Sequence, residues 1–128
     1  MKKGFTLIEL IVSIAILALM IFGIAELFPR ATIAARTAQR LTGAVNLAQA
    51  QMETMIAMDY VLVTPGTFEA RHTVTTPFER QTIVAYIDPA TLAVRASDLG
   101  LKRIIVTVYY PTLQGTRSFD LTSIIANH

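Results

Sequence analysis

Residues 5–25 read FTLIELIVSIAILALMIFGIA, a continuous apolar stretch near the start of the chain. It has no Lys or Arg and a single acid, Glu9. At about 1.5 Å per residue, a helix of this length is roughly 31 Å long, which is enough to cross the hydrocarbon core of a bilayer. The chain of 128 residues is 53% hydrophobic with a mean hydropathy of +0.52, more than most soluble domains. The sequence therefore predicts one membrane-spanning helix and one small domain.

The residues before the apolar stretch do not form an ordinary secretory signal. Such a signal has a shorter apolar region that is followed by a small-residue cleavage site. Here Lys2 and Lys3 come first, and the small residue at a plausible cut, Gly4, precedes the apolar stretch. Cleavage by ordinary signal peptidase is therefore not expected.

The charge balance argues against a nucleic-acid-binding surface. The net charge is +2 and the isoelectric point is about 9.2, but without Lys2 and Lys3 the chain has nine basic and nine acidic side chains. Charge alone does not decide the orientation of the span in the membrane, because Lys2 and Lys3 precede it and Arg30, Arg36 and Arg40 follow it. The chain has no cysteine, which excludes disulfides and thiol chemistry. We expect a membrane as a partner, and nucleic acid is not expected.

Glu9 is the unusual residue of the predicted span. A carboxylate at the bilayer centre costs about 2.5 to 3.5 kcal/mol on insertion scales, and such residues are usually retained for function. Glu9 follows Phe5 by about 6 Å along a helix, so it would lie near the membrane interface. Once buried among neighbouring helices, it would need a cationic partner. Glu26 would lie about 25 Å further along, at the opposite interface.

The helix is expected to continue beyond the membrane as an amphipathic helix over residues 30–60. Gly23 and Pro29 weaken the backbone ladder between the two parts, so a kink or a functional hinge with local unwinding is expected there. Spacings of three and four residues, or their sums, define the apolar face of the second part. Its members are Ile33, Leu41, Val45, Ala48, Met52, Met55 and Ile56. Methionines at this spacing, here Met52, Met55 and Met58, are typical of core packing and not of a metal or haem site.

After Pro65 and Gly66, alternating and β-branched residues predict strands. The candidates are residues 68–75, 81–87, 101–110 and 117–126. Turns are expected at residues 76–77, 88–89 and 111–115, the last of which suits an antiparallel hairpin. The linker between residues 89 and 100 is expected to be irregular, with a short helical turn. The predicted fold is α+β, a long N-terminal helix packed on a small antiparallel sheet of three or four strands.

Residues 2–9, KKGFTLIE, followed by an apolar helix, resemble the N-terminus of type IV prepilins and type II secretion pseudopilins. The resemblance implies that prepilin peptidase cuts between Gly4 and Phe5 and methylates the new amino group of Phe5. It places Glu9 at the fifth position of the mature chain. There the acid pairs with the Phe5 amine of a neighbouring subunit during filament assembly. Other pilins or pseudopilins and an inner-membrane assembly platform are the implied partners.

The resemblance also implies a domain organisation and a location. Residues 1–4 are a leader, residues 5–29 form the transmembrane and assembly segment, and residues 30–128 form a pilin-like domain with its β region at 67–127. Before assembly, the chain is expected to be a single-pass protein of the bacterial inner membrane with a periplasmic C-terminal domain. Afterwards it is expected in a periplasmic or cell-surface filament.

Two further stretches, residues 46–53 and residues 101–111, resemble minor pilins of the PilV type and minor pseudopilins of the I type. The sequence lacks the cysteine-bounded loop common in major pilins and an evident acidic calcium loop of the kind seen in major pseudopilins. The expected function is a structural one, a minor subunit that helps initiate, cap or modify filament assembly. The alternative is a filament-tip subunit that contacts DNA, a surface or a secreted substrate. The sequence leaves open whether the filament serves as a pilus, in secretion or in DNA uptake.

The sequence does not favour catalysis. It has no Gly-rich phosphate loop, and its two histidines, His72 and His128, build neither a metal cluster nor a Ser-His-Asp set. His72 is expected to be a structural residue of a strand. Tyr109 and Tyr110 would point to opposite faces of a strand, so they cannot form one stacking platform for bases. We predict no catalytic, cofactor-binding or metal-binding residues.

Overall fold

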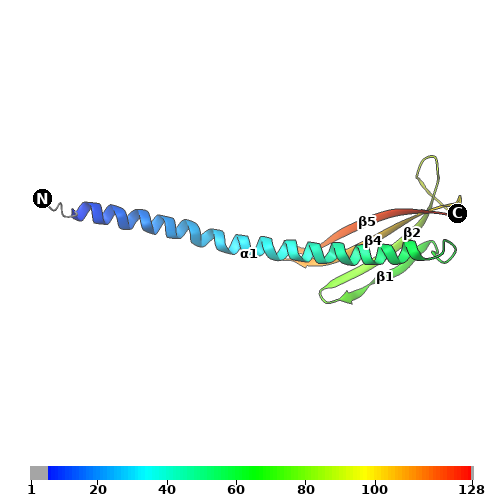
Figure 1. Ribbon diagram of the computed structural model, residues 1–128, viewed down its shortest axis with the longest axis horizontal. Helices are drawn as coiled ribbons and strands as arrows, with labels where there is room; N and C mark the ends of the chain where they lie inside the picture. Colours follow the sequence, from blue (N-terminus) through cyan, green and yellow to red (C-terminus); the bar gives the residue numbers. More distant parts are fainter. Residues whose placement is uncertain (1–5, 128) are drawn as a thin grey trace. The chain divides into compact units, whose positions relative to one another are not determined.

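The computed structural model describes residues 6–127, and its long helix, α1, runs from Leu7 to Ala57 (Figure 1). The chain divides into two compact units, residues 1–36 and residues 37–128, and α1 contributes to both. The predicted unwinding is not found, because α1 includes Gly23 and Pro29 without interruption. Pro29 has no N–H to donate to the carbonyl four residues earlier, so the helix continues with one backbone hydrogen bond fewer.

The second unit contains one antiparallel sheet of five strands. They are β1 (Gly66–Thr75), β2 (Phe78–Ile87), β3 (Val94–Arg95), β4 (Leu101–Thr112) and β5 (Gly115–Ala126). The order is β1-β2-β4-β5, and β3 pairs with the end of β2. The α+β class and the antiparallel sheet are confirmed, while the strand number exceeds the predicted three or four because of the short β3.

β3 lies in the linker that was expected to be irregular. The Asp88 carboxylate accepts a hydrogen bond from the Ala90 N–H at 2.8 Å, and the Leu92 N–H donates to the Asp88 carbonyl at 2.8 Å, which forms the predicted helical turn. The Ala90 amide is the main cause of the lowered pKa of Asp88. Leu92 has a φ of 57°, and the chain then returns so that Val94 pairs with Ile87. A two-residue strand is too short to produce a periodic signal in the sequence.

β4 shows the alternation expected of a strand with one buried face. Its even-numbered residues from Lys102 to Tyr110 are buried, and its odd-numbered residues are partly exposed. Tyr109 and Tyr110 therefore lie on opposite faces, as predicted. The Tyr110 ring is in the core, whereas the Tyr109 ring lies on the other face, 4.0 Å from the Arg71 guanidinium carbon.

β4 and β5 form the predicted hairpin. Thr112 pairs with Gly115, so the loop contains only Leu113 and Gln114. Pro111 was expected in the turn but lies in β4. In a hairpin with a two-residue loop, the residues that flank the loop, here Thr112 and Gly115, form a hydrogen-bonded pair, and the next pair, Pro111 with Thr116, exchanges no backbone hydrogen bonds. Proline is tolerated at position 111 because no N–H is needed there to pair with β5.

The core of the second unit lies between α1 and one face of the sheet. Its members are Ala44, Ala48, Met52, Met55, Val63, Val84, Ile104, Val106, Val108 and Tyr110. The predicted helix face is therefore correct at Ala48, Met52 and Met55. It is wrong at Ile33, Leu41 and Ile56, which are 42%, 40% and 53% exposed.

Small residues select the buried face of α1. Gly43 leaves space for the ring of Phe78, since a Cβ atom at position 43 would lie 2.8 Å from the ring Cζ. Ala44, one residue later, is fully buried. These small side chains let the Phe78 ring and the sheet approach this part of α1, whereas Met52 and Met55 fill the space further along the helix.

Charged side chains next to this core are paired. Arg80 donates to both carboxylate oxygens of Glu69, at 2.8 and 2.6 Å, and the Thr82 hydroxyl donates to the same carboxylate at 2.9 Å. The Arg80 hydrogen bond is the main cause of the lowered pKa of Glu69. His72 lies on β1 with its Nε2 atom 3.4 Å from Glu69. The contacts of Glu69 with Arg80 and Thr82 join β1 to β2, whereas Glu69 and His72 both lie on β1.

Candidate assembly segment

The first turn of α1 is capped. The Thr6 hydroxyl oxygen accepts a hydrogen bond from the Glu9 N–H at 3.4 Å, and the Thr6 carbonyl accepts one from the Leu10 N–H at 3.2 Å. Thr6 is therefore the N-cap, and Glu9 occupies the third helical position. A negatively charged side chain there is stabilised by the positive end of the helix dipole. The spacing Thr-x-x-Glu is a capping-box signature. Interpreting Glu9 only as an intramembrane acid had missed the role of Thr6.

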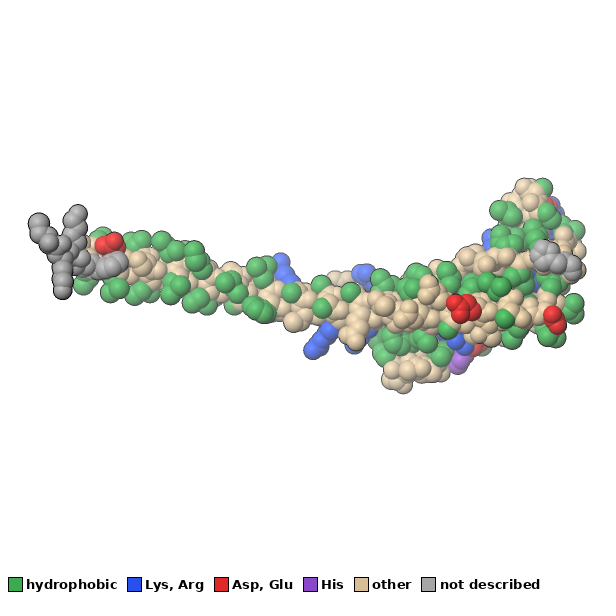
Figure 2. All heavy atoms as spheres, in the orientation of Figure 1, with side chains coloured by type: hydrophobic (Ala, Val, Ile, Leu, Met, Phe, Trp, Pro, Cys, Tyr) green, Lys and Arg blue, Asp and Glu red, His purple; other side chains and the backbone are tan. Residues whose placement is uncertain are grey.

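The apolar side chains that follow Glu9, up to Phe28, are not buried against any described part of the chain. In the described part of α1, the most apolar window of 18 residues contains no buried residue. Large apolar side chains from Leu7 to Phe28 are 50–78% exposed, and hydrophobic side chains cover this part of the helix in Figure 2. Soluble monomers rarely expose a continuous apolar surface of this extent. By length and composition, the segment is suited to a bilayer.

Glu9 and Glu26 are the two acids of the first unit, and both are exposed. The Ser13 hydroxyl donates to the Glu9 backbone carbonyl at 2.7 Å and not to the Glu9 carboxylate. The four ion pairs formed within residues 6–127 all join side chains between Glu69 and Arg95, in the second unit. The Glu9 carboxylate is thus presented on the surface of an otherwise apolar helical segment.

Of the other predicted site residues, Gly4 and Phe5 lie outside the described residues. So does His128, at the end of the chain. The side chains of Met52 and Met55 are in the core, in agreement with the packing interpretation, whereas Met58 follows the end of α1 and is 37% exposed. Across residues 6–127, no group of three or more His, Asp or Glu side chains is arranged to hold a metal ion.

The model of the prokaryotic N-terminal methylation motif matches residues 1–25. The chain carries a prepilin-type leader. This leader supports a type IV pilin or pseudopilin family for the chain, and it implies processing by prepilin peptidase and assembly with other pilins. It also points to a structural subunit, a class that is usually not enzymatic. No curated protein and no solved structure matches the chain significantly.

The prepilin-type leader and the apolar part of α1 are consistent with each other. The motif ends at Ala25, and the exposed apolar side chains begin at Leu7 and continue to Phe28. Together they suit a membrane-anchored pilin. The motif ends well before the second unit, so the sheet and its surfaces have to be interpreted from their own geometry.

Proposed function

We propose that the protein is a minor pilin or pseudopilin that helps initiate, cap or modify the assembly of a type IV pilus or a type II secretion filament. One observation carries this proposal. A prepilin-type leader is followed directly by a helical segment that buries none of its apolar side chains within the chain and bears an acid, Glu9, in its first turn. Such a surface is stable in lipid, or packed against the equivalent helices of other subunits.

Before assembly, residues 5–29 hold the subunit in the inner membrane, and residues 30–128 lie in the periplasm. Prepilin peptidase removes residues 1–4, and the exposed amino group of Phe5 is methylated. Gly4 suits the cleavage site because a residue without a side chain leaves the extended backbone unhindered. The assembly platform then transfers the mature subunit from the membrane to the growing filament.

In the filament, Glu9 pairs with the Phe5 amine of a neighbouring subunit. Packing among helices removes water from the carboxylate, and a buried charge that loses its partner costs about 3 to 5 kcal/mol. Water near the membrane interface reduces this cost. The same acid in a lone subunit is exposed. Glu9 is therefore proposed to act at assembly and not at anchoring.

The assignment to the minor class is supported by residues 46–53 and 101–111, which resemble PilV-type minor pilins and I-type minor pseudopilins. Residues 101–111 lie in β4, the central strand that supplies much of the core. The chain has no cysteine to close a C-terminal loop of the kind found in major pilins. A low-copy subunit is the function that these features support best.

The test compares Glu9→Gln with Glu26→Gln at equal expression. Gln also suits the third position of a capping box, so the first variant removes the charge and keeps the helix start. Both variants are expected to be cleaved and to remain in the inner membrane. Glu9→Gln is expected to be depleted from sheared filaments by at least about fivefold, the ratio that 1 kcal/mol produces, whereas Glu26→Gln is incorporated normally.

Mass spectrometry of the sheared filaments completes the experiment. The wild-type subunit is expected to begin at a methylated Phe5. Equal incorporation of Glu9→Gln and wild type would show that this acid is not an assembly contact. A mature subunit that retains Met1 would contradict the proposed processing.

A further inference from the structure

β5 is a free edge of the sheet. Within residues 6–127, no strand pairs with it on the side away from β4. The Asn127 N–H donates to the Gly100 carbonyl at 2.9 Å, just beyond the pair formed by Leu101 and Ala126. Hydrogen-bonded and non-hydrogen-bonded pairs alternate along an antiparallel ladder. The even-numbered residues of β5 therefore direct their N–H and C=O groups away from β4.

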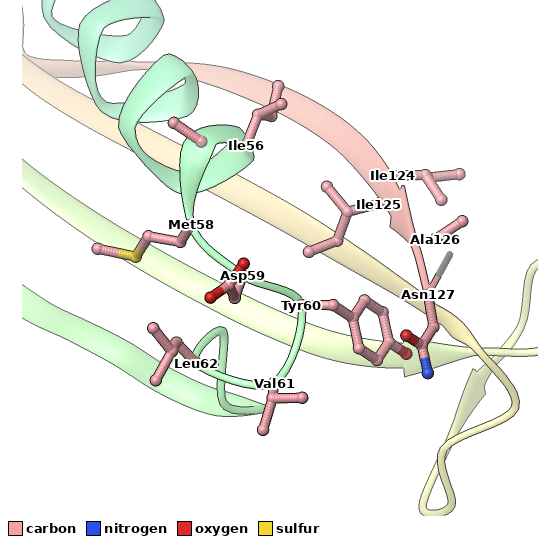
Figure 3. A pocket seen from close by; sticks show the side chains of 11 residues that line it. Ile56, Met58, Asp59, Tyr60, Val61, Leu62, Ile124, Ile125, Ala126 and Asn127 are labelled. Carbon is pink, nitrogen blue, oxygen red and sulfur yellow. The ribbon is translucent and has the colours of Figure 1, made fainter.

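An apolar groove of about 800 Å³ borders the last part of this edge (Figure 3). One wall is the end of α1 with the loop after it, residues 56–62, and the other is the end of β5 with the residue that follows, residues 124–127. The exposed side chains of Ile56 and Leu62 line the first wall. Ile125, which is partly buried and packs against the core, lines the second. A chain extended along β5 would form backbone hydrogen bonds with the edge and place alternate side chains in the groove.

The wall formed by the loop is held in place through Tyr60. The Lys102 ammonium donates to the Tyr60 carbonyl at 2.6 Å and lies 3.8 Å from the centre of the Tyr60 ring. The Tyr60 hydroxyl donates to the Asp98 carboxylate at 2.6 Å. Burial and this hydrogen bond raise the pKa of Tyr60, so the hydroxyl remains a neutral donor. These contacts make the groove a preformed site, which lowers the entropic cost of binding.

The charge of the groove favours a cation. Asp59 is the one ionised side chain among its lining residues, and it is exposed. The last turn of α1 contains no basic residue, so its free carbonyl groups add partial negative charge. Lys102 is only 3% exposed and its charge faces Asp98, whose pKa is lowered chiefly by the Tyr60 hydrogen bond and also by Lys102.

We propose that the edge of β5 and this groove bind an extended segment of another protein, which adds a strand to the sheet. The segment has aliphatic side chains toward the groove and a Lys or Arg that meets Asp59. Strand addition satisfies the free backbone groups of Thr122, Ile124 and Ala126, and the groove provides selectivity. This surface is distinct from the assembly segment at the start of α1.

A second copy of the chain is a poorer occupant. α1 and β5 run in the same direction, since Arg40 donates to the Pro111 carbonyl opposite the start of β5 and Ile56 lines the groove with Ile125 near its end. Antiparallel pairing of two β5 strands would make the two α1 helices run in opposite directions. Subunits anchored at the same end in one membrane do not meet in this way, whereas a segment of another protein has no such restriction.

The test uses the full chain in detergent micelles and a fixed set of synthetic peptides of about ten residues, a length that spans the strand edge. In each peptide Val or Ile alternates with Thr, and one Arg occupies each position facing the groove in turn. Residue-resolved amide exchange measures protection, and fluorescence anisotropy measures affinity. At saturation we expect the amides of Thr122, Ile124 and Ala126 to exchange at least about tenfold more slowly.

Two pairs of variants separate the backbone and charge contributions. Ile124→Pro removes an N–H that points away from β4 and should weaken peptide binding at least about tenfold, whereas Ile124→Thr keeps the N–H and serves as its control. Asp59→Asn should weaken binding by about two- to fivefold. Asp120→Asn, on β5 but outside the groove, should not weaken it. Replacing the peptide Arg by Gln should reproduce the Asp59→Asn effect.

Three outcomes would overturn the proposal. They are an absence of protection at the β5 edge with every peptide, binding that persists in Ile124→Pro, and protection of the same amides by self-association without peptide, which would make a second copy the occupant. The measurements are made on the isolated chain. Their failure would therefore leave the role of Glu9 in filament incorporation unaffected.

Discussion

Residues 7–36 and residues 37–57 belong to one helix, yet they place their apolar side chains in opposite environments. In the first part, the large apolar side chains up to Phe28 are at least 50% exposed. In the second part, two alanines and two methionines are 5% exposed or less. The contrast shows that apolar side chains alone do not determine which part of the helix is buried. A buried face exists only where the helix meets the sheet.

The largest expected effect tests this contrast with two methionines of α1. Met55 is fully buried and Met20 is 61% exposed. Met55→Ala should lower the free energy of unfolding of the second unit by about 2 to 5 kcal/mol, because it leaves a cavity in the core. Met20→Ala should leave it unchanged.

Tyrosine fluorescence during urea unfolding provides the measurement, because all four tyrosines lie between positions 60 and 110. The signal therefore reports on the second unit. Equal unfolding midpoints for the two methionine variants would mean that the packing of α1 on the sheet contributes little to stability.

Gly23 and Gly43 allow the same comparison between the exposed and the buried part of α1. A Cβ atom at position 43 would lie 2.8 Å from the Phe78 ring, whereas at position 23 it would meet nothing within 4 Å. Gly43→Val should destabilise the second unit by about 1 to 3 kcal/mol through overpacking. Gly23→Val should not change its urea midpoint. A neutral Gly43→Val would show that the Phe78 ring moves aside without cost.

The smallest expected effect concerns pH. The Arg80 hydrogen bond lowers the pKa of Glu69 in the folded chain below the ordinary value of 4.5. The resulting stability is therefore fully present above that value, and it is lost as the pH falls through the lowered folded-state pKa. The urea midpoint of the second unit should fall between about pH 5 and about pH 3.

Glu69→Gln is the control for this titration. The variant should show a shallower decline in the same range, and a remaining slope is expected because the pKa values of Asp88 and Asp98 are lowered as well. Identical slopes for Glu69→Gln and wild type would exclude a contribution from the contact between Glu69 and Arg80. The apolar part of α1 contains no group of this ion pair, so association of the chain with detergent micelles should not change over this range.

Much of the fold was predictable because its signals are local. The β-branched and aromatic residues of the stretch 101–110 predicted β4, and the turn at residues 111–115 predicted the hairpin. The helix face was predicted less well, since spacing alone assigns Leu41 to the core and omits Ala44. Spacing identifies a set of apolar residues but not the distance between the helix and the sheet. That distance is set here by Gly43 and Phe78.

The candidate assembly segment was predictable for a related reason. The length of the apolar stretch, its exposed surface and the position of Glu9 depend on composition and on the rise of a helix, and both can be derived from the sequence alone. The capping role of Thr6 was also within reach, because a capping box spans four consecutive positions. Gly4 and Phe5 remain predictions from the resemblance.

The apolar span, the acid within it and most of the strands that follow could be predicted from local sequence, because each depends on neighbours within a few residues. The buried side of α1, the free edge of β5 and the contact of Lys102 with Tyr60 beside the groove became evident only from the three-dimensional arrangement. These features join segments that are far apart in the chain, such as Tyr60 with Asp98 and Ile56 with Ile125. The energies of such contacts depend on distances in space, and no local pattern of residues records them.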